Sequence, residues 1–405
     1  MFYLFAILIA LTSAEWEVDV LYTGRIDAAI QVTSCAWSSG NIAIAYEIMD
    51  LRNILTMTLN YMLYKPNQGI LVDEYISSWH PIPRPPADTT NFVPTVLVHG
   101  NEVYLAGRAA CLPVELFPEC ANDPLSNADH FWVVDRDTGV VISEEAVEHN
   151  TSMAHQGVIS IDNRGTEIIA CYRIGIANPV QDVACNWRIN GVWNENPMLI
   201  TDAPLNQNRP MIKLDSQGHI MIVYADIKDD GTRLIHVWKG NENGEIYDVI
   251  VSQETSGCDH PDIFLSSQDE IYVAYHCGEK NKLGDVMAAT CSENCEDREN
   301  WVEHLVFEAT EEIKAGFVNI ALTKQRYPFV VYQKAIDSIP SIYCSTLQSD
   351  GTWEEVLVDP TPYSCRKDFG RRSLTVSPDG DAYIVYLALG ARGYNEMHLA
   401  HYTHI

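Results

Sequence analysis

The sequence has no long apolar run after residue 14, so we expect no membrane-spanning helix in the rest of the chain. Residues 1–14, MFYLFAILIALTSA, are apolar, carry no charge and end in small residues. A run this short does not span a bilayer comfortably, because about 20 apolar residues are needed. We therefore predict a signal peptide over residues 1–14, with an N-terminal anchor as the alternative, and an extracellular protein whose mature chain, 15–405, is one domain.

Basic residues are also scarce, with 26 Lys and Arg against 55 Asp and Glu and a net charge of −29. This charge repels nucleic acid, anionic membranes and polyanionic polymers, so we expect none of them as a partner unless a local basic pocket exists. The favoured interpretation of the acidity is solubility in an extracellular medium. A Ca²⁺ site at Asp226, Asp229 and Asp230 is the alternative, but their spacing fits no EF-hand loop and a solvated turn is favoured.

The chain lacks the paired Cys-x-x-Cys and Cys/His spacings of zinc sites, so we expect no metal there. Its eleven cysteines instead suit an exported, disulfide-bonded protein. The expected pairs are Cys111–Cys120, Cys171–Cys185, Cys258–Cys277, Cys291–Cys295 and, more weakly supported, Cys344–Cys365, which leaves Cys35 as the odd thiol. The sequon at Asn150 predicts a glycosylation site.

One strand–turn–strand phrase recurs seven times at intervals of roughly fifty to sixty residues. Its clearest copy is PMIKLDSQGHIMIVYAD, residues 210–226, and a tyrosine ends most copies. Apolar residues alternate on both sides of an Asp-, Ser- and Gly-rich turn, so each copy is predicted to be a β-hairpin. Two further strand-like runs follow most hairpins. Four antiparallel strands per unit predict an all-β, seven-bladed propeller.

The last unit offers only three strands before the chain stops at Ile405. The segment EWEVDVLY, Glu15 to Tyr22, precedes the first phrase and alternates as a strand does. An unpaired sheet edge is costly. We therefore predict that Glu15 to Tyr22 completes the last blade and closes the ring.

The innermost strands of a propeller surround its central channel, so the side chains that precede them are candidates for a ligand site. The alignment places these at that position: Asp27, Val93, Gln156, Arg209, His260, Phe317 and Arg371, with Arg25, His155 and Arg372 nearby. Arginine suits a carboxylate or vicinal hydroxyls, so Arg209 and Arg371 are expected to contact ligand. His260 could act as a general acid or base. The alternatives are arginines that bridge loops and a histidine that packs on the following proline.

Two long loops flank the second blade on the same face. Residues 75–92 are proline-rich and carry Trp79, and residues 108–130 contain Cys111 and Cys120. An exposed tryptophan on a rigid loop suits a sugar-binding wall. The alternative is that Trp79 and the prolines only plug the mouth of the channel.

Short motifs give the chain a family resemblance. SDGTW, residues 349–353, and NGVW, residues 190–193, look like Asp-box turns, and GRIDAAIQV with GNIAIAYE, within residues 24–47, resembles the opening of sialidases. The chain thus resembles the sialidase and BNR-repeat propellers. The resemblance implies that Arg25 matches the arginine that binds the sialate carboxylate, while Asp27 replaces the family's proline.

The chain also departs from that family. Seven units stand where sialidases have six blades, and Arg371 and Arg372 stand where the tyrosine nucleophile is expected. The nearest tyrosine is Tyr363, and Asp50 and Glu47 are the candidate acid/base neighbourhood. Without a tyrosine and an acid placed together, the covalent route has no assigned residues.

These features leave three hypotheses. We favour an extracellular propeller that binds a glycan, a polysaccharide or a glycosylated partner at the channel mouth. The alternative is a carbohydrate-active enzyme, either a sialidase-like hydrolase or a polysaccharide lyase, with His260, Asp50 and Tyr363 as catalytic candidates. A structural extracellular scaffold is the third. The sequence does not indicate the oligomeric state.

Overall fold

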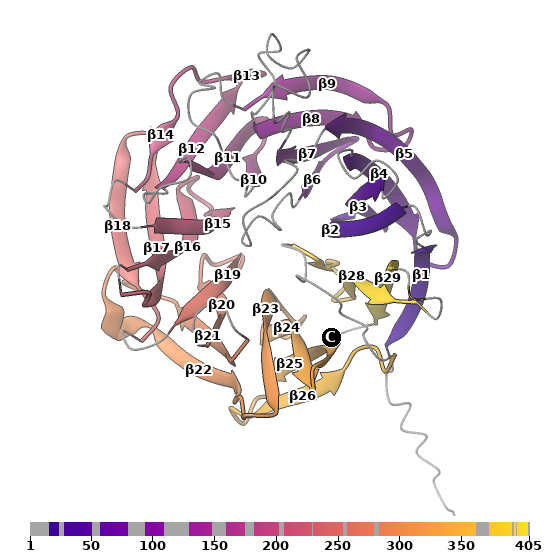
Figure 1. Ribbon diagram of the computed structural model, residues 1–405. Coiled ribbons are helices and arrows are strands. Elements are labelled where there is room, and N and C mark those ends of the chain that lie inside the picture. Colours follow the sequence, from indigo (N-terminus) through magenta and orange to yellow (C-terminus); the bar gives the residue numbers. More distant parts are fainter. Residues whose placement is uncertain are drawn as a thin grey trace, which may run out of the picture.

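Seven four-stranded sheets stand around a central axis like the blades of a propeller (Figure 1). The computed structural model describes residues 16–23, 28–50, 57–79, 94–108, 129–147, 159–174, 182–201, 206–228, 230–253, 257–278, 283–361, 372–390, 393 and 395–403. Each sheet is antiparallel, and the strands of the first six blades follow chain order from the axis outward. The third blade has a short additional strand, and the seventh takes its outermost strand from the other end of the chain. The predicted seven-bladed propeller is confirmed.

The blades have the following strands. Blade 1 has β2 (Ala28–Ser38), β3 (Asn41–Asp50), β4 (Met57–Lys65) and β5 (Gly69–Trp79); blade 2 has β6 (Thr95–His99), β7 (Glu102–Arg108), β8 (Asp129–Asp135) and β9 (Val141–Ala146). Blade 3 has β10 (Ile159–Arg164), β11 (Glu167–Ile174), β12 (Asp182–Ile189), β13 (Val192–Trp193) and β14 (Met198–Leu199); blade 4 has β15 (Asn206–Leu214), β16 (Ile220–Ile227), β17 (Arg233–Asn241) and β18 (Gly244–Ile250). Blade 5 has β19 (Cys258–Leu265), β20 (Ile271–Cys277), β21 (Asp285–Cys291) and β22 (Val302–Phe307); blade 6 has β23 (Ile313–Leu322), β24 (Pro328–Ile336), β25 (Ile339–Leu347) and β26 (Trp353–Leu357). Blade 7 has β27 (Leu374–Val376), β28 (Ala382–Leu389), β29 (Asn395–Tyr402) and, from the other end of the chain, β1 (Glu17–Thr23).

Strand β1 closes the ring as the outermost strand of blade 7. It pairs antiparallel with β29, with Val18 opposite Ala400. Its Leu21 is buried among side chains of blades 1 and 7, and Trp16 and Val18 pack on the cluster between blades 6 and 7. The predicted closure is therefore confirmed, with the strand shifted from 15–22 to 17–23.

The core consists of separate apolar clusters, each between two neighbouring blades. The cluster between blades 4 and 5, for example, contains Val223, Val237, Ile263 and Tyr275. Inner strands are also linked by polar groups: the Ile320 N–H donates to the Asp262 carboxylate at 3.0 Å, for example. Each blade therefore depends on its neighbours, and an open ring would expose two apolar faces.

In five of the blades the tyrosine that marks the repeat is buried, and its hydroxyl donates to a carboxylate. These pairs are Tyr46–Asp73, Tyr224–Asp248, Tyr275–Glu303, Tyr332–Glu355 and Tyr386–Asp359. Burial raises the pKa of Tyr275, and the hydrogen bond to Glu303 raises it further, so the hydroxyl keeps its proton. A buried tyrosine hydroxyl needs such a partner. Part of the acidity of the chain thus serves the repeat itself.

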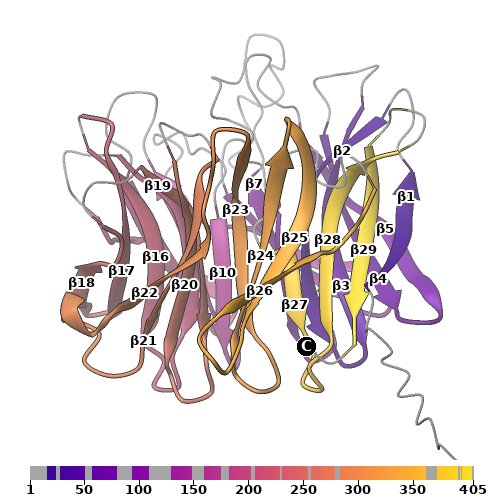
Figure 2. The same ribbon diagram turned by 90° about the horizontal axis from the view of Figure 1, so that it is seen from below.

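The two faces of the ring differ in their connections (Figure 2). We call the loop face the side on which the chain enters each inner strand and passes from the second strand to the third. The turn face is the side with the tight turns between first and second strands. One such turn, Asp215 to Gly218, is closed by the Gly218 N–H on the Asp215 carbonyl at 2.9 Å, and Gly218 has a positive φ of 84° that glycine adopts without strain.

Three of the expected disulfides are present: Cys171–Cys185 and Cys258–Cys277 join paired strands, and Cys291–Cys295 closes a turn. The expected Cys344–Cys365 pair is wrong, because Cys344 is a buried free thiol that contacts the Val356 carbonyl. Cys35 is also free, as predicted, and it is buried. The other expected pair, Cys111–Cys120, and the sequon at Asn150 lie outside the described residues, as does Cys365.

The described part of the chain contains no helix long and apolar enough to cross a membrane. The predicted signal peptide lies outside it. Of the acidic residues weighed as calcium ligands, Asp230 accepts a hydrogen bond from Thr232 N–H at 2.8 Å within its own turn, and Asp229 is not among the described residues.

Candidate functional site

Three neighbouring inner strands carry a β-bulge at the same level, close to the loop face. The pairing register shifts between Asn208 and Met211 in β15, between Asp259 and Asp262 in β19, and between Gly316 and Val318 in β23. A bulge bends a strand and re-aims its side chains. We expected Arg209, His260 and Phe317 to precede these strands; they lie within them, because pairing resumes beyond each bulge.

The bulged residues Arg209, His260 and Phe317 have positive φ angles of 58°, 51° and 53°. Backbone of this kind is unfavourable for residues other than glycine and clusters at functional sites. Arg209 contacts the His260 ring, and His260 packs edge-on against Phe317 with ring centroids 4.5 Å apart. Blades 4, 5 and 6 thus contribute one continuous row of side chains.

Asp259, the residue before His260, joins two guanidinium groups. Its carboxylate pairs with Arg209 at 3.2 Å and with Arg233, which begins β17. Burial alone would raise the pKa of Asp259, but the charges of Arg209, His260 and Arg233 outweigh burial and hold the pKa far below its usual range. The carboxylate is therefore ionised, and it anchors both arginines.

His276, on β20, completes the cluster. Its ring stacks on His260 at 4.9 Å, and its Nδ1 accepts a hydrogen bond from the Phe317 N–H at 3.3 Å. Burial lowers the pKa of His276 to about 4, so the ring is neutral at pH 7. Since Nδ1 is an acceptor, the ring proton is on Nε2. Gly316 permits this approach: a Cβ there would lie 3.0 Å from the His276 ring.

We call Arg209, Arg233, Asp259, His260 and His276 the Arg–His cluster. It holds two guanidinium groups against one carboxylate, a local excess of positive charge in an acidic chain. The cluster is mostly buried, but 19% of the His260 side chain and 10% of that of Arg209 are exposed. An anionic group with ring hydroxyls would find charged donors and aromatic faces together here.

Arg372 has a different position from the one expected. Its guanidinium crosses the channel and donates to the carbonyls of Ile161 in blade 3 and Ile212 in blade 4, the latter at 2.6 Å. These contacts lie further from the loop face than the Arg–His cluster, and the nearby charges are those of Lys213 and Asp262. Arg209 and His260 are therefore brought together, whereas Arg372 contacts the inner strands of blades 3 and 4 instead.

The other expected site residues remain predictions. Those outside the described residues are Arg25, Asp27, His155, Gln156, Tyr363 and Arg371, and the side chains of Asp50 and Trp79 are not described either. Glu47 is fully buried on β3, and its carboxylate oxygens have no hydrogen-bond partner among the described residues. Burial raises its pKa well above the usual value. Burial therefore favours its protonated form, and it lies in the interior on the side of β3 that faces blade 2 with Ala43 and Ala45.

Sequence reasoning missed Asp259, Arg233 and His276. The sequence offered a signal for two of them. Asp259 directly precedes His260, and His276 directly precedes Cys277, which ends β20. Arg233 offered no signal, because its contact with Asp259 depends on how blade 4 lies against blade 5.

No protein-family model matches the chain, and no curated protein matches it. Solved structures similar to it include an ulvan lyase of polysaccharide lyase family PL25, bound to -[GlcA(1-4)Rha3S]-, at TM-score 0.59 and 10% identity over 90% of each chain. A protein of unknown function from Dyadobacter fermentans has TM-score 0.53 and 11% identity over 96% of this chain and 98% of its own. A Trypanosoma rangeli sialidase, at TM-score 0.48 and 8% identity, covers 95% of this chain and 59% of its own. An α-L-arabinanase from Penicillium chrysogenum, at TM-score 0.48 and 11% identity over 94% of this chain and 97% of its own, is also among the structures found. At such identities the likeness is one of fold alone, and it is supported by the two structures above TM-score 0.5.

Proposed function

We propose that the protein binds an acidic carbohydrate on the loop face, through the Arg–His cluster. The observation that carries the proposal is the pairing of Arg209 and Arg233 with the single carboxylate of Asp259. A chain of net charge −29 repels anions unless it holds such a local excess of positive charge. Guanidinium groups present donors in a fork that matches a carboxylate or a sulfate.

The carbohydrate class rests on two further points. His260 and Phe317 place aromatic rings next to the guanidinium of Arg209, and specific sites combine apolar faces with a few polar groups. The ulvan lyase of similar fold was solved with a ligand that contains glucuronate and a sulfated sugar. An acidic polysaccharide, or a glycoprotein that carries acidic sugars, is the partner we infer.

Binding outside the cell agrees with the three disulfides, which persist in oxidising compartments. Secretion through the predicted signal peptide at residues 1–14 is part of the proposal. Binding of calcium and glycosylation of Asn150 also remain proposals.

A polysaccharide lyase is the second candidate. In such a reaction a base removes the proton next to the uronate carboxylate, the bond to the leaving oxygen breaks, that oxygen is protonated and a double bond forms in the sugar. The neutral ring of His276 and the two arginines favour this idea, since arginine would neutralise the uronate. Against His276 as the base, its Nδ1 already accepts the Phe317 N–H. Binding without chemistry is therefore the better-supported function.

A titration with paired ligands tests the proposal. The purified protein is titrated calorimetrically with a glucuronate-containing oligosaccharide and with the same oligosaccharide after reduction of its carboxyl groups. We expect the glucuronate-containing oligosaccharide to bind with measurable heat. The carboxyl-reduced oligosaccharide should bind at least about tenfold more weakly, because it loses one charged pair with the protein. Equal affinity for the two oligosaccharides, or no binding of either, would refute the proposal. An increase in ultraviolet absorbance during incubation would identify an unsaturated product and establish the lyase.

A further inference from the structure

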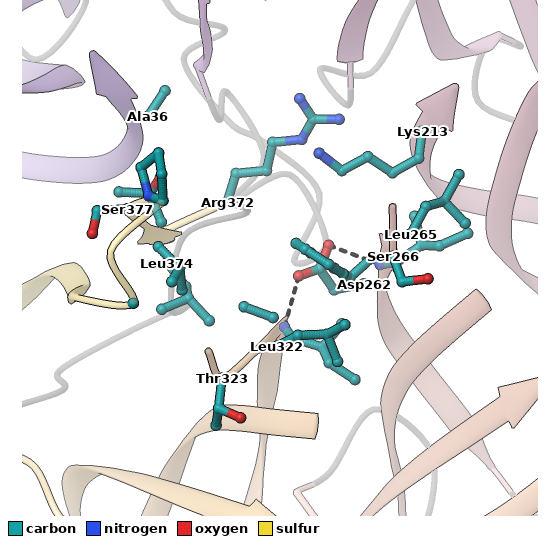
Figure 3. A pocket seen from close by; sticks show the side chains of 18 of the residues that line it. Ala36, Lys213, Asp262, Leu265, Ser266, Leu322, Thr323, Arg372, Leu374 and Ser377 are labelled. Atoms are coloured by element: carbon teal, nitrogen blue, oxygen red, sulfur yellow. Dashed lines mark hydrogen bonds between the residues drawn. The ribbon is translucent and has the colours of Figure 1, made fainter. Parts of the chain in front are cut away.

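The turn-face end of the central channel is a separate cavity of about 470 Å³. It is bounded by inner strands of blades 1, 2 and 4 to 7 and by the turns that end β19, β23 and β27. The guanidinium of Arg372 lies across it (Figure 3). None of the residues of the Arg–His cluster lines this cavity.

Two cationic side chains meet in the cavity. Figure 3 shows Lys213 of β15 reaching toward the side chain of Arg372 from the opposite side of the channel. Arg372 is held in place by its bonds to the carbonyls of Ile161 and Ile212. Of the described residues, none lies within hydrogen-bond or ion-pair distance of the Lys213 ammonium. Among the described residues, no carboxylate pairs with either cation, and two like charges without a counter-charge are costly inside a protein.

The acids near this pair are already engaged by backbone groups. Asp262 accepts N–H groups from Ile263 at 2.9 Å and Ile320 at 3.0 Å, and Asp162 accepts the Leu214 N–H at 3.0 Å. Burial raises the pKa of Asp262, which weakens its ability to balance the cations. Burial also lowers the pKa of Lys213, as expected for an ammonium that lacks a close anion.

The walls between the cations and the turn face are largely apolar. They include Val96, Leu97, Leu265, Leu322 and Leu374, contributed by different blades. At the rim, Lys324 and Arg326 add positive charge, and Arg326 pairs with Glu270 at 2.8 Å. The cavity thus has cations at its inner end and hydrocarbon along its sides.

We propose that this end of the channel binds a small organic carboxylate with an apolar body. The carboxylate of the ligand accepts hydrogen bonds from the ammonium of Lys213 and from the N–H groups of Arg372 that do not bond the carbonyls of Ile161 and Ile212. The apolar body of the ligand contacts the leucines. A free metabolite and the carboxylate of a larger molecule would share this chemistry. The proposal goes beyond the carbohydrate site, which uses other residues nearer the loop face, and either site can exist without the other.

The test uses para-fluorobenzoate as the probe, with para-fluorobenzyl alcohol and acetate as comparisons. Fluorine NMR follows the two fluorinated compounds directly, and acetate is tested as a competitor. We expect the carboxylate to bind at least about tenfold more tightly than the alcohol, because only the carboxylate pairs with both cations. Acetate should compete only weakly, because it lacks the apolar body.

Variants of the protein test whether the probe binds in this cavity. Lys213→Met keeps the length of the side chain and removes its charge, so affinity for para-fluorobenzoate should fall at least about tenfold. The matched control Lys65→Met, on β4 away from the channel, and His260→Ala, in the Arg–His cluster, should bind as the wild type does. If Lys213→Met does not fold by circular dichroism, Lys213→Gln replaces it. Equal affinity for acid and alcohol, unchanged affinity of the Lys213 variant, or no binding up to the solubility of the probe would overturn the proposal.

Discussion

The guanidinium of Arg209 in blade 4 contacts the imidazole of His260 in blade 5, although the two residues lie far apart in the sequence. Both occupy the bulge of an inner strand with positive φ. This contact exists only because two blades carry the same irregularity at the same level. It places a cation, an aromatic ring and the buried carboxylate of Asp259 at one point of the channel wall.

Asp259→Asn should destabilise the protein by about 3–5 kcal/mol, because it leaves two largely buried guanidinium groups without a counter-charge. Denaturant unfolding at pH 7 measures the change. Asp230→Asn is the control, since Asp230 is exposed in a turn, and it should change the free energy of unfolding by less than about 0.5 kcal/mol. A loss at Asp259 no larger than that of the control would show that the ion pairs contribute little.

His276 should make the fold sensitive to mild acid. Its pKa is lowered from 6.5 to about 4 in the folded state, so between these values the unfolded chain binds a proton that the folded chain does not. The free energy of unfolding therefore falls as the pH falls from about 6.5 to 4, by up to about 3 kcal/mol. His276→Gln should remove this contribution and flatten the profile of denaturation midpoint against pH. An unchanged slope would contradict the buried neutral ring.

Gly284→Ala tests the contact between blades 5 and 6 on the loop face. Gly284 exchanges two backbone hydrogen bonds with Ala315, at 2.7 and 3.0 Å, and a Cβ at Gly284 would lie 1.9 Å from the Cys277 carbonyl oxygen. The backbone must shift, and we expect a loss of about 1–3 kcal/mol in thermal or denaturant unfolding. Gly107→Ala is the matched control, because the nearest atom to its Cβ is 3.8 Å away. Similar losses in both variants would argue against a tight contact at Gly284.

Ring closure predicts a difference between two neighbouring residues of β1. Leu21 is 8% exposed between blades 1 and 7, whereas 54% of Val20 is exposed. Leu21→Ala should cost about 2–5 kcal/mol of unfolding free energy, and Val20→Ala less than about 1 kcal/mol. If the two variants unfold alike, β1 does not hold the ends of the ring together.

The architecture could be predicted because its signals are periodic. The repeated tyrosine gives the pitch of the blades, and its hydroxyl pairs with acids such as Asp248 and Glu303 that recur with it. The last unit lacks one strand, and the alternating segment near the N-terminus is a strand without a unit of its own, so the two could be assigned to each other. Cys171 and Cys185 face each other directly once the strands are aligned.

The site was only partly predictable because it depends on irregularities and on contacts between blades. A bulge adds a residue without a clear sequence mark, so the alignment placed Arg209 and His260 outside strands that in fact contain them. The contact of Arg233 with Asp259 joins β17 to β19, and no local pattern encodes that pairing. The pair Cys344–Cys365 was the most weakly supported of the expected disulfides, and nothing in the sequence pattern reveals that the Cys344 thiol is buried and free.

The most direct test of the proposed carbohydrate site is a calorimetric titration of Arg209→Met with a glucuronate-containing oligosaccharide. Arg164→Met, an exposed arginine on the turn face, serves as the matched control, and circular dichroism shows that both variants are folded. We predict that Arg209→Met weakens binding at least about tenfold and that Arg164→Met binds like the wild type, since only Arg209 lies in the cluster. Wild-type affinity in the Arg209 variant would contradict the account.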